Sequence, residues 1–389
     1  MTKHINIQPF KDFFRSEQIG GIILLFCVAV SISIANSSLG SEFEQLLSTK
    51  VGFSTENLHL DYSFSMWIND GLMAIFFLLV GLEIKREMLE GELSNPRKAA
   101  MPIMAALGGM LLPAAIYTFF NQGYETAHGW GIPMATDIAF ALGVISLLGK
   151  HVPASLKVFL AALAIADDLG AIIVIAVFYT NELHWMELLY SGSILLVLIL
   201  MNRMGVKKLV FYIIPGIFLW YFVHHSGIHA TIAGVLLALT IPTNPVKETS
   251  PLEKLEHIIV RPVNFLIMPI FALANTNIRF EQGMVDGLFS PLGAGIILGL
   301  FLGKPFGVLL FSWLSVKLGF GTLPSGANWK HITGLGMLAG IGFTMSIFVS
   351  MLSFSNPEFQ TEAKFAILTA SVSAGIAGYL FLNFLSKRN

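Results

Sequence analysis

Apolar residues along the chain fall into long runs separated by short polar connections. Most runs have the roughly 17 to 25 residues that an α-helix needs to cross the hydrocarbon core of a bilayer. The runs lie at 19–35, 65–84, 99–120, 131–149, 154–179, 184–201, 209–223, 228–242, 262–275, 291–316, 332–353 and 364–385. The eighth and ninth runs are short, which predicts spans that are tilted less, broken or buried among their neighbours. The pattern predicts an all-α polytopic membrane protein with about 12 transmembrane helices.

Composition agrees with this class. Apolar and aromatic residues make up 55% of the 389 residues and charged residues only 12%, about half the usual share. The mean hydropathy is +0.73. The net charge of −1 excludes a nucleic-acid partner that would be bound by neutralising its phosphates. The single cysteine, Cys27, allows neither an intrachain disulfide nor a cysteine-based metal site.

The lysines and arginines predict the orientation, because cytoplasmic loops collect them. With the amino terminus inside, 19 of the 23 fall on the cytoplasmic side. Lys50, Arg279 and Lys364 fall outside, and Lys304 lies within a span. Both termini are therefore predicted to be cytoplasmic. The alternative is that the first run is a signal peptide, since the sequence up to Ala35 resembles a cleavage site, but every later loop alternates correctly with that run in place. No connection is long enough for a soluble domain, and the longest, at about 36–64, is merely acidic and polar.

Four charged residues lie within the predicted spans. Asp137 is in the fourth run, Asp167 and Asp168 are in the fifth, and Lys304 is near the middle of the tenth. A charge at the centre of a span costs at least about 2.5 to 3.5 kcal/mol, so each needs a partner or a purpose. Asp167 lies about ten residues from Lys157 at the cytoplasmic edge, or roughly 15 Å deep at 1.5 Å per residue. The aspartates are therefore predicted at the bilayer midplane.

Adjacent residues on a helix point about 100° apart, so Asp167 and Asp168 cannot face the same neighbour. Such a pair can exchange protons for a cation. A dehydrated sodium ion needs several oxygens, and the two carboxylates, a hydroxyl such as that of Thr136 and freed backbone carbonyls could supply them. The alternative is a buried ion network that only holds helices together. Three acids against one base leave an excess of negative charge that such a network has no reason to keep.

Two of the predicted spans contain residues that interrupt a helix. The fourth has Pro133 before A-T-D-I-A-F-A-L-G, and the eleventh contains G-L-G-M-L-A-G-I-G-F-T-M-S at 334–346. Broken backbone at membrane depth must line a cavity or be buried in protein, and the ends of half-helices then present partial charges to ions. The alternative is that these glycines are only close-packing positions.

Acidic and basic residues mix at two places on the predicted cytoplasmic edge. One is E-I-K-R-E, from Glu83 to Glu87, and the other is E-K-L-E-H, from Glu253 to His257. The ordinary interpretation of each is a solvated loop face. The hypothesis with a function is that His257 titrates near neutral pH and reports the acidity of the cytoplasm.

Sequence motifs along the chain resemble those of the NhaA-type sodium/proton antiporters of the bacterial inner membrane. The resemblance covers nearly the whole chain. It is carried by G-G-I-I-L at 20–24, W-I-N-D at 67–70, F-F-L-L-V-G-L-E-I-K-R-E at 76–87, A-T-D-I-A-F-A-L-G at 135–143, A-I-A-D-D-L-G-A-I-I at 164–173, G-I-H-A-T at 227–231, L-E-H at 255–257, G-K-P-F-G at 303–307 and G-I-G-F-T-M-S at 340–346. A-D-D-L-G, T-D and G-K-P are specific in combination, although each alone is weak.

The resemblance implies a fold and a domain organisation. It implies twelve helices, with the third to fifth repeated in inverted orientation as the tenth to twelfth, and with the fourth and eleventh unwound where they cross at the ion site. The whole chain, 1–389, would be one antiporter domain. Its core bundle would be 99–179 with 289–385, and the remaining helices would form an interface or dimerisation bundle.

The resemblance also implies roles for individual residues. Asp167 and Asp168 match the carboxylates that bind Na⁺ and carry protons. Thr136 and Asp137 match the unwound fourth helix and Lys304 the partner of the first aspartate, so these three would support the site and compensate its charge. The matching pH-response region comprises Glu83, Lys85, Arg86, Glu87, Glu256 and His257. Val260 stands where a relative has histidine, which argues against a set of histidines in this region.

The implied activity is secondary active transport, not catalysis. Cytoplasmic Na⁺ or Li⁺ would be exchanged for external H⁺ with about two protons per sodium, by a pH-regulated homodimer in contact with membrane lipid, with no cofactor and no nucleic-acid partner. Three alternatives remain. An intramembrane aspartyl protease needs acids on different helices and usually a G-x-G-D motif, which the chain lacks. A sodium-coupled symporter of an organic anion would use Lys304 to hold the anion, which the excess of acids disfavours. A passive channel would need a repeated acidic ring.

Overall fold

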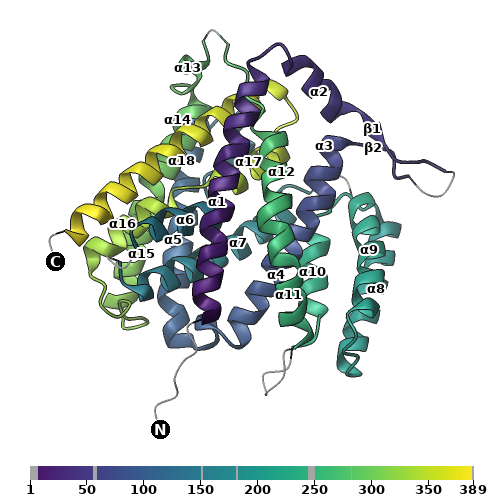
Figure 1. Cartoon of the computed structure of the whole chain (residues 1–389), viewed down its shortest axis with the longest axis horizontal. Helices are drawn as coiled ribbons and strands as arrows, with labels where there is room; N and C mark the ends of the chain where they lie inside the picture. The colour runs from purple at the N-terminus through teal and green to yellow at the C-terminus, as the bar shows by residue number, and fades with distance from the viewer. Residues whose placement is uncertain are drawn as a thin grey trace.

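The chain folds almost entirely into helices that pack side by side (Figure 1). The structure is a computed structural model that describes residues 8–55, 59–149, 152–180, 183–243, 250–281 and 283–387, with side chains from Ile19 onward. Of the cations assigned to the cytoplasm, Lys3, Lys150, Lys247 and Arg388 lie outside the described residues.

The longer helices occupy the predicted spans. They are α1 (Gln8–Ala35), α4 (Met73–Leu89), α5 (Pro96–Asn121), α6 (Ile138–Leu147), α7 (Ala154–Phe178), α8 (Trp185–Arg203), α9 (Val210–His225), α10 (Ile232–Thr240), α11 (Pro251–Pro262), α12 (Met268–Asn275), α14 (Pro291–Leu298), α15 (Lys304–Lys317), α16 (Trp329–Ala339), α17 (Phe343–Ser353) and α18 (Pro357–Ser386). Three π-helical segments, η1 (Trp67–Leu72), η5 (Val263–Ile267) and η6 (Gly299–Gly303), interrupt the α-helical geometry within spans.

Shorter elements connect these helices. They are α2 (Gly40–Ser48), α3 (Phe64–Met66), α13 (Met284–Gly287), the 3₁₀ segments η2 (Glu92–Ser94) and η3 (Glu125–Gly131), and the strands β1 (Lys50–Val51) and β2 (Tyr62–Ser63). The strands pair antiparallel, with Lys50 opposite Ser63. The connection predicted to be merely acidic and polar therefore contains a helix and a β-hairpin. The sequence pattern did not reveal them, because the apolar residues of this connection alternate over too short a length.

Seven of the described helical stretches are long and apolar enough to cross a membrane. Two further stretches qualify as bent pairs, α1 with α2 at 110° and α16 with α17 at 46°. Helices α6 and α9 are shorter and apolar. The prediction of an all-α polytopic membrane protein is confirmed.

The ninth span differs from its prediction. The sequence pattern starts it at residue 262, whereas the helix starts at Pro251 and continues through η5 and α12 to Asn275. Ser250 caps this helix, and the Glu253 side chain returns the hydrogen bond to the Ser250 backbone. A good cap and a first-turn proline outweigh the charges of the E-K-L-E-H segment. The interpretation of that segment as a solvated loop is wrong.

Glycines allow a close contact between α5 and α15. A Cβ on Gly108 would lie 2.2 Å from the carbonyl oxygen of Gly307, and one on Gly307 would lie 2.1 Å from that of Gly108. Only a residue without a side chain permits backbones to approach in this way. The helix that carries Lys304 is thereby held against α5.

Buried apolar side chains form two clusters. The larger one includes residues of α1, α4 to α7, α12 and α14 to α18, and the smaller one joins α8, α9 and α10 to parts of α4 and α11. Figure 1 shows α8 and α9 at one edge of the molecule, with α15, α16 and α18 at the opposite edge. Asp137, Asp167, Asp168 and Lys304 lie among the helices that form the larger cluster.

Candidate functional site

Two interrupted helices meet at the centre of the site. The backbone is not helical between η3 and α6, and α16 and α17 are separated by Gly340 to Gly342. The Asp137 N–H donates to the carbonyl oxygen of Ile341 at 2.7 Å, so each break supplies a hydrogen-bond partner to the other. This pairing satisfies backbone groups that lipid could not. The prediction that the fourth and eleventh spans are broken where they cross is confirmed.

Asp137 lies at the N-termini of two half-helices. Its Oδ1 accepts a hydrogen bond from Phe140 N in α6 at 3.1 Å. Its Oδ2 accepts from Thr344 N in α17 at 3.0 Å and from the Thr344 hydroxyl. Both helix ends carry partial positive charge, and a carboxylate between them offsets it. The geometry is that of a charge-compensating group, and both carboxylate oxygens are already engaged.

Asp167 is held by groups from three segments. Its Oδ2 accepts from the Lys304 ammonium at 2.6 Å, and both side chains are fully buried. Lys304 also donates to the carbonyl oxygen of Met134 in the unwound segment. The Thr136 hydroxyl lies 2.7 Å from Asp167 Oδ2 and 2.9 Å from the carbonyl oxygen of Ala339, and its one hydrogen can go to only one of them.

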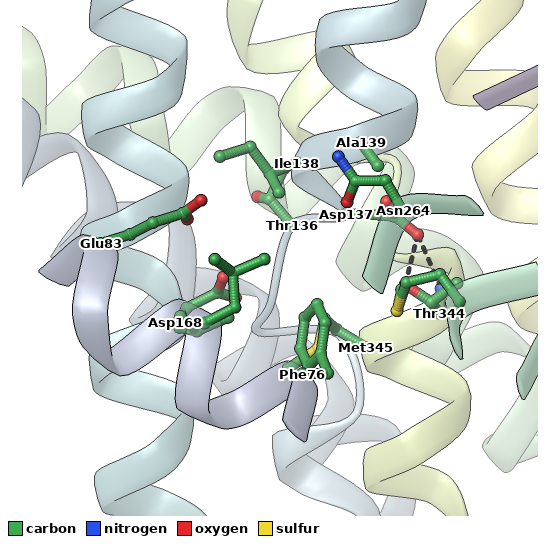
Figure 2. A pocket seen from close by; sticks show the side chains of 13 residues that line it. Phe76, Glu83, Thr136, Asp137, Ile138, Ala139, Asp168, Asn264, Thr344 and Met345 are labelled. Carbon is green, nitrogen blue, oxygen red and sulfur yellow. Dashed lines mark hydrogen bonds between the residues drawn. The ribbon is translucent and has the colours of Figure 1, made fainter. Parts of the chain in front are cut away.

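Asp168 faces a different direction, as its position on the helix requires. It lines a cavity of about 30 Å³, the small cavity, together with Glu83, Thr136, Asp137, Asn264 and Thr344 (Figure 2). That volume holds one or two water molecules. Asp168 Oδ1 and Asp167 Oδ1 are buried without a hydrogen-bond partner in the described part of the chain. Each aspartate therefore has an oxygen available to a ligand.

A larger cavity of about 710 Å³, the charged cavity, lies next to the small one. Its lining includes five of the six residues predicted for pH response, namely Glu83, Arg86, Glu87, Glu256 and His257. Arg86 pairs with Glu87 at 3.0 Å and with Glu256 at 3.1 Å, which ties α4 to α11. Glu83 and Ile138 line both cavities, so the charged cavity leads toward Asp168.

Lys85 is the predicted residue that the fold separates from this group. Its ammonium donates to the carbonyl oxygens of Leu239 at 2.7 Å and Ile241 at 2.5 Å. These carbonyls belong to the end of α10, where the helix leaves acceptors unpaired. Lys85 therefore caps a helix and does not line the charged cavity, although it stands between two residues of that group in sequence.

Two polar residues of the small cavity, Thr344 and Asn264, were not assigned from the sequence. Thr344 belongs to the G-I-G-F-T-M-S motif, but its hydroxyl could not be matched to Asp137, which lies 207 positions away. Asn264 is a polar residue within the apolar segment η5, and that polarity is the signal that could have identified it.

Comparisons with known proteins agree with the fold and the site. A helical membrane protein with buried carboxylates and a lysine where two broken helices cross has the features of an ion transporter. The family model described as Na+/H+ antiporter 1 matches residues 11–382. The chain therefore belongs to the Na+/H+ antiporter 1 family, a family of membrane transporters, as the motifs had predicted.

Individual relatives are similar over nearly their whole length. The chain is 61% identical over 388 residues to "Na(+)/H(+) antiporter NhaA 2" of Flavobacterium johnsoniae, covering 100% of this chain and 95% of that protein. It is 51% identical over 378 residues to "Na(+)/H(+) antiporter NhaA" of Vibrio campbellii, covering 96% and 95%. It is 48% identical over 380 residues to the protein of that name from Bordetella parapertussis, covering 96% of each.

Proposed function

We propose that the protein exchanges cytoplasmic Na⁺ or Li⁺ for external H⁺. The observation that carries the proposal is the pair of adjacent buried carboxylates, Asp167 and Asp168, each with an unpartnered oxygen beside the crossing of two broken helices. Buried carboxylates bind either a proton or a cation, because a bare charge at this depth is costly. The names of the relatives support the same ions.

The contacts suggest how the binding of sodium releases protons. Sodium entering the small cavity displaces a proton from Asp168 and then competes with Lys304 for Asp167. The second proton leaves from Asp167 or from the released Lys304 ammonium. Lys304 keeps the carbonyl of Met134 as an acceptor when it leaves Asp167. If two protons move inward for each sodium moved outward, one positive charge enters per cycle. Each 100 mV of inside-negative potential then contributes about 2.3 kcal/mol, which drives sodium uphill.

Access is proposed to alternate by movement between two groups of helices. The first is the core, formed by 99–179 and 289–385, and the second comprises the remaining helices. The smaller cluster of buried apolar side chains lies entirely among the remaining helices, whereas the larger cluster joins the core to α1, α4 and α12. The charged cavity would be the cytoplasmic route to Asp168, because the predicted topology places its arginine and lysine side chains on that side.

The environment and partners follow from the family and the charge distribution. The protein is proposed to lie in a bacterial inner membrane with both termini in the cytoplasm, in contact with lipid and as a homodimer. It would act as a transporter and not as an enzyme, using no cofactor and no nucleic-acid partner. The described elements exposed to lipid include α8, whose apolar residues are mostly accessible at the surface of the single chain.

The alternatives lose support from the same contacts. Lys304 donates to Asp167 and to the backbone, so an organic anion would have to displace a carboxylate to bind it. An aspartyl protease needs two acids that share one water, whereas both oxygens of Asp137 accept hydrogen bonds from the half-helices. The family of the relatives also argues against both alternatives.

The test is transport in everted membrane vesicles that contain the protein. A respiration-driven pH gradient is imposed, and NaCl, LiCl or KCl is then added while the gradient is followed with a fluorescent dye. Sodium or lithium should discharge the gradient and potassium should not. Vesicles with equal protein but no response to either ion would refute the proposal.

A further inference from the structure

Two polar residues of the small cavity, Glu83 and Asn264, lie outside the proposed core. Asn264 lies on η5, the π-helical segment between α11 and α12, and lines the cavity that contains Asp168. In Figure 2 Asn264 lies on the side of Asp137 and Thr344, with Glu83 and Asp168 facing them. π-Helical segments often occur at functional sites, because they displace a side chain from its α-helical direction. The rest of the wall is mostly apolar and includes Phe76 and Met268.

Most oxygens around this cavity are already committed. Both oxygens of Asp137 accept hydrogen bonds, and the Thr344 hydroxyl donates to one of them. The hydroxyl hydrogen of Thr136 goes to Asp167 or to Ala339. Glu83 also lines the cavity, and its carboxylate interacts electrostatically with the Arg86 guanidinium. Asp168 has a buried oxygen without a partner in the described residues. A hard cation needs several oxygen ligands, and one carboxylate is too few.

We propose that the amide oxygen of Asn264 is a ligand of the transported cation, together with Asp168. This inference rests on the proposed exchange of sodium for protons and adds a ligand that comes from outside the core helices. An amide oxygen is neutral and has two lone pairs, so it can bind a cation while it accepts from another group. Its position on the second group of helices means that movement between the groups separates it from Asp168. Loss of this ligand would then help to release sodium.

A neutral ligand has a kinetic signature that a carboxylate lacks. An amide does not gain or lose a proton in the working pH range, so Asn264 adds to sodium affinity and not to the number of protons exchanged. Removal of the amide should therefore weaken sodium binding equally at every pH. Removal of a carboxylate would change the sodium affinity and the proton count together.

The experiment compares Asn264→Ala with Asn275→Ala in everted vesicles. Asn275 is a matched control because it lies in the same span, on α12, but does not line the small cavity. Its side-chain amide donates a hydrogen bond of 2.8 Å to the side-chain oxygen of Asn69. Asn264→Ala should raise the apparent KM for sodium roughly ten-fold, as the loss of a metal-binding contact does, with the maximal rate and the pH profile unchanged. Asn275→Ala should keep the wild-type KM. Asn264→Asp restores an oxygen with added negative charge and should lower the KM below that of Asn264→Ala.

Binding is measured independently through the effect of NaCl on the thermal unfolding midpoint of purified protein in detergent. The sodium concentration that half-saturates this stabilisation should rise in Asn264→Ala by the same factor as the KM. A wild-type KM in Asn264→Ala, or a reduced maximal rate at unchanged KM, would assign Asn264 a purely structural role and overturn the proposal. If Asn264→Ala does not insert, the same criteria apply to Asn264→Leu, which keeps the approximate size of the side chain without an oxygen. Wild-type protein that fails to exchange in these vesicles would instead refute the proposed function itself.

Discussion

Asp167 and Asp168 are neighbours in sequence but have different surroundings. Asp167 contacts the Lys304 ammonium, which lies 137 positions away in the sequence, and the Thr136 hydroxyl. Asp168 lines the small cavity, and its Oδ1 has no partner among the residues described. The 100° between adjacent helical positions allows one residue to hold the protein's own cation while the next faces a cation from solution.

Replacement of either aspartate by Asn should abolish exchange while leaving membrane insertion intact. Each change removes a cation ligand and a proton carrier, and an uncharged amide is easier to bury than a carboxylate. Exchange is measured by discharge of a pH gradient in everted vesicles, with expression confirmed by immunoblot. Asp70→Asn is the control, since Asp70 is an acid within a span that lies near His224, at 3.4 Å, and not at the crossing. Turnover retained in Asp167→Asn or Asp168→Asn would argue against the two-carboxylate mechanism.

Lys304 is expected to be mainly a counter-ion to Asp167. Lys304→Gln should lower the thermal unfolding midpoint markedly, because removing one partner of a buried ion pair typically costs about 3–5 kcal/mol. The double variant Lys304→Gln/Asp167→Asn should recover most of that stability, since it leaves no unpaired charge. Differential scanning fluorimetry of the purified variants measures both. Current from proteoliposomes on a solid-supported membrane tests the other role: a variant that exchanges without net charge movement would make Lys304 a proton carrier.

At the scale of the elements, the crossing depends on two helices that stop at membrane depth. A Cβ on Gly340 would lie 2.5 Å from the carbonyl oxygen of Leu300, so the end of α16 can approach η6 only without a side chain. The half-helix that follows, α17, starts at Phe343 and shares the carboxylate of Asp137 with α6. Asp137 thereby connects the two breaks and offsets the partial charge of both helix ends.

Asp137→Ala should leave weak exchange with a higher KM for sodium. The change uncovers two partial positive charges beside the cation, but it removes no oxygen that the described contacts leave free. Asp137→Asn should be milder, because the amide oxygen still accepts hydrogen bonds from the helix ends although it carries no charge. Initial rates over a range of sodium concentrations give the KM of each variant. A normal KM in Asp137→Ala would remove the charge-compensating role.

The β1–β2 hairpin is a second case in which elements depend on a few polar contacts. The Trp67 indole donates to the carbonyl oxygen of Val51 at 2.9 Å, and the Tyr62 hydroxyl donates to that of His59 at 2.8 Å. Burial raises the pKa of Tyr62 to about 12, so the hydroxyl remains a donor across the physiological range. The Trp67 bond joins β1 to the start of the span that begins at Phe64, and the Tyr62 bond lies within the hairpin itself.

At the scale of the whole molecule, the charged cavity joins α4 to α11 and leads to the small cavity. Arg86 spans the two helices through its pair with Glu256. The same cavity collects further carboxylates, including Glu87 and Glu253. Carboxylates outnumber Arg86 and Lys98 in its lining. A concave surface with an excess of negative charge focuses the potential and raises the local concentration of cations and protons.

Glu256→Gln should move the pH profile of exchange toward acid pH, with the maximal rate roughly preserved. The variant lacks one negative charge in the lining of the charged cavity. The remaining titratable groups of the cavity then hold their protons less strongly and release them at a lower pH. Rates at saturating sodium over a pH series give the profile. Asp61→Asn is the control, because its side chain is 43% exposed, pairs with Lys50 and does not line the charged cavity. A fixed profile with a lower rate would make Glu256 a structural residue.

Much of the fold was accessible from the sequence. Runs of apolar residues predicted the class and the approximate position of each span, because lipid tolerates no unpaired backbone and few charges. The same cost identified Asp137, Asp167, Asp168 and Lys304 as residues in need of partners. The pattern missed the helical start of α11 because a cap and a proline determined it, and it missed the hairpin because two-residue strands carry no periodic signal.

The sequence alone determined which residues lie in the membrane, which of them are charged and where the helices break. Only the tertiary structure decided the partners of those residues. Lys304 contacts Asp167, Lys85 turns to the end of α10, and Asn264 faces Asp168 across the small cavity. These outcomes depend on how each helix is rotated about its own axis. That rotation is set by glycine contacts between parts of the chain more than 100 positions apart and by the π-helical segments. Local sequence specifies the depth of a residue in the membrane, but its direction is specified by packing.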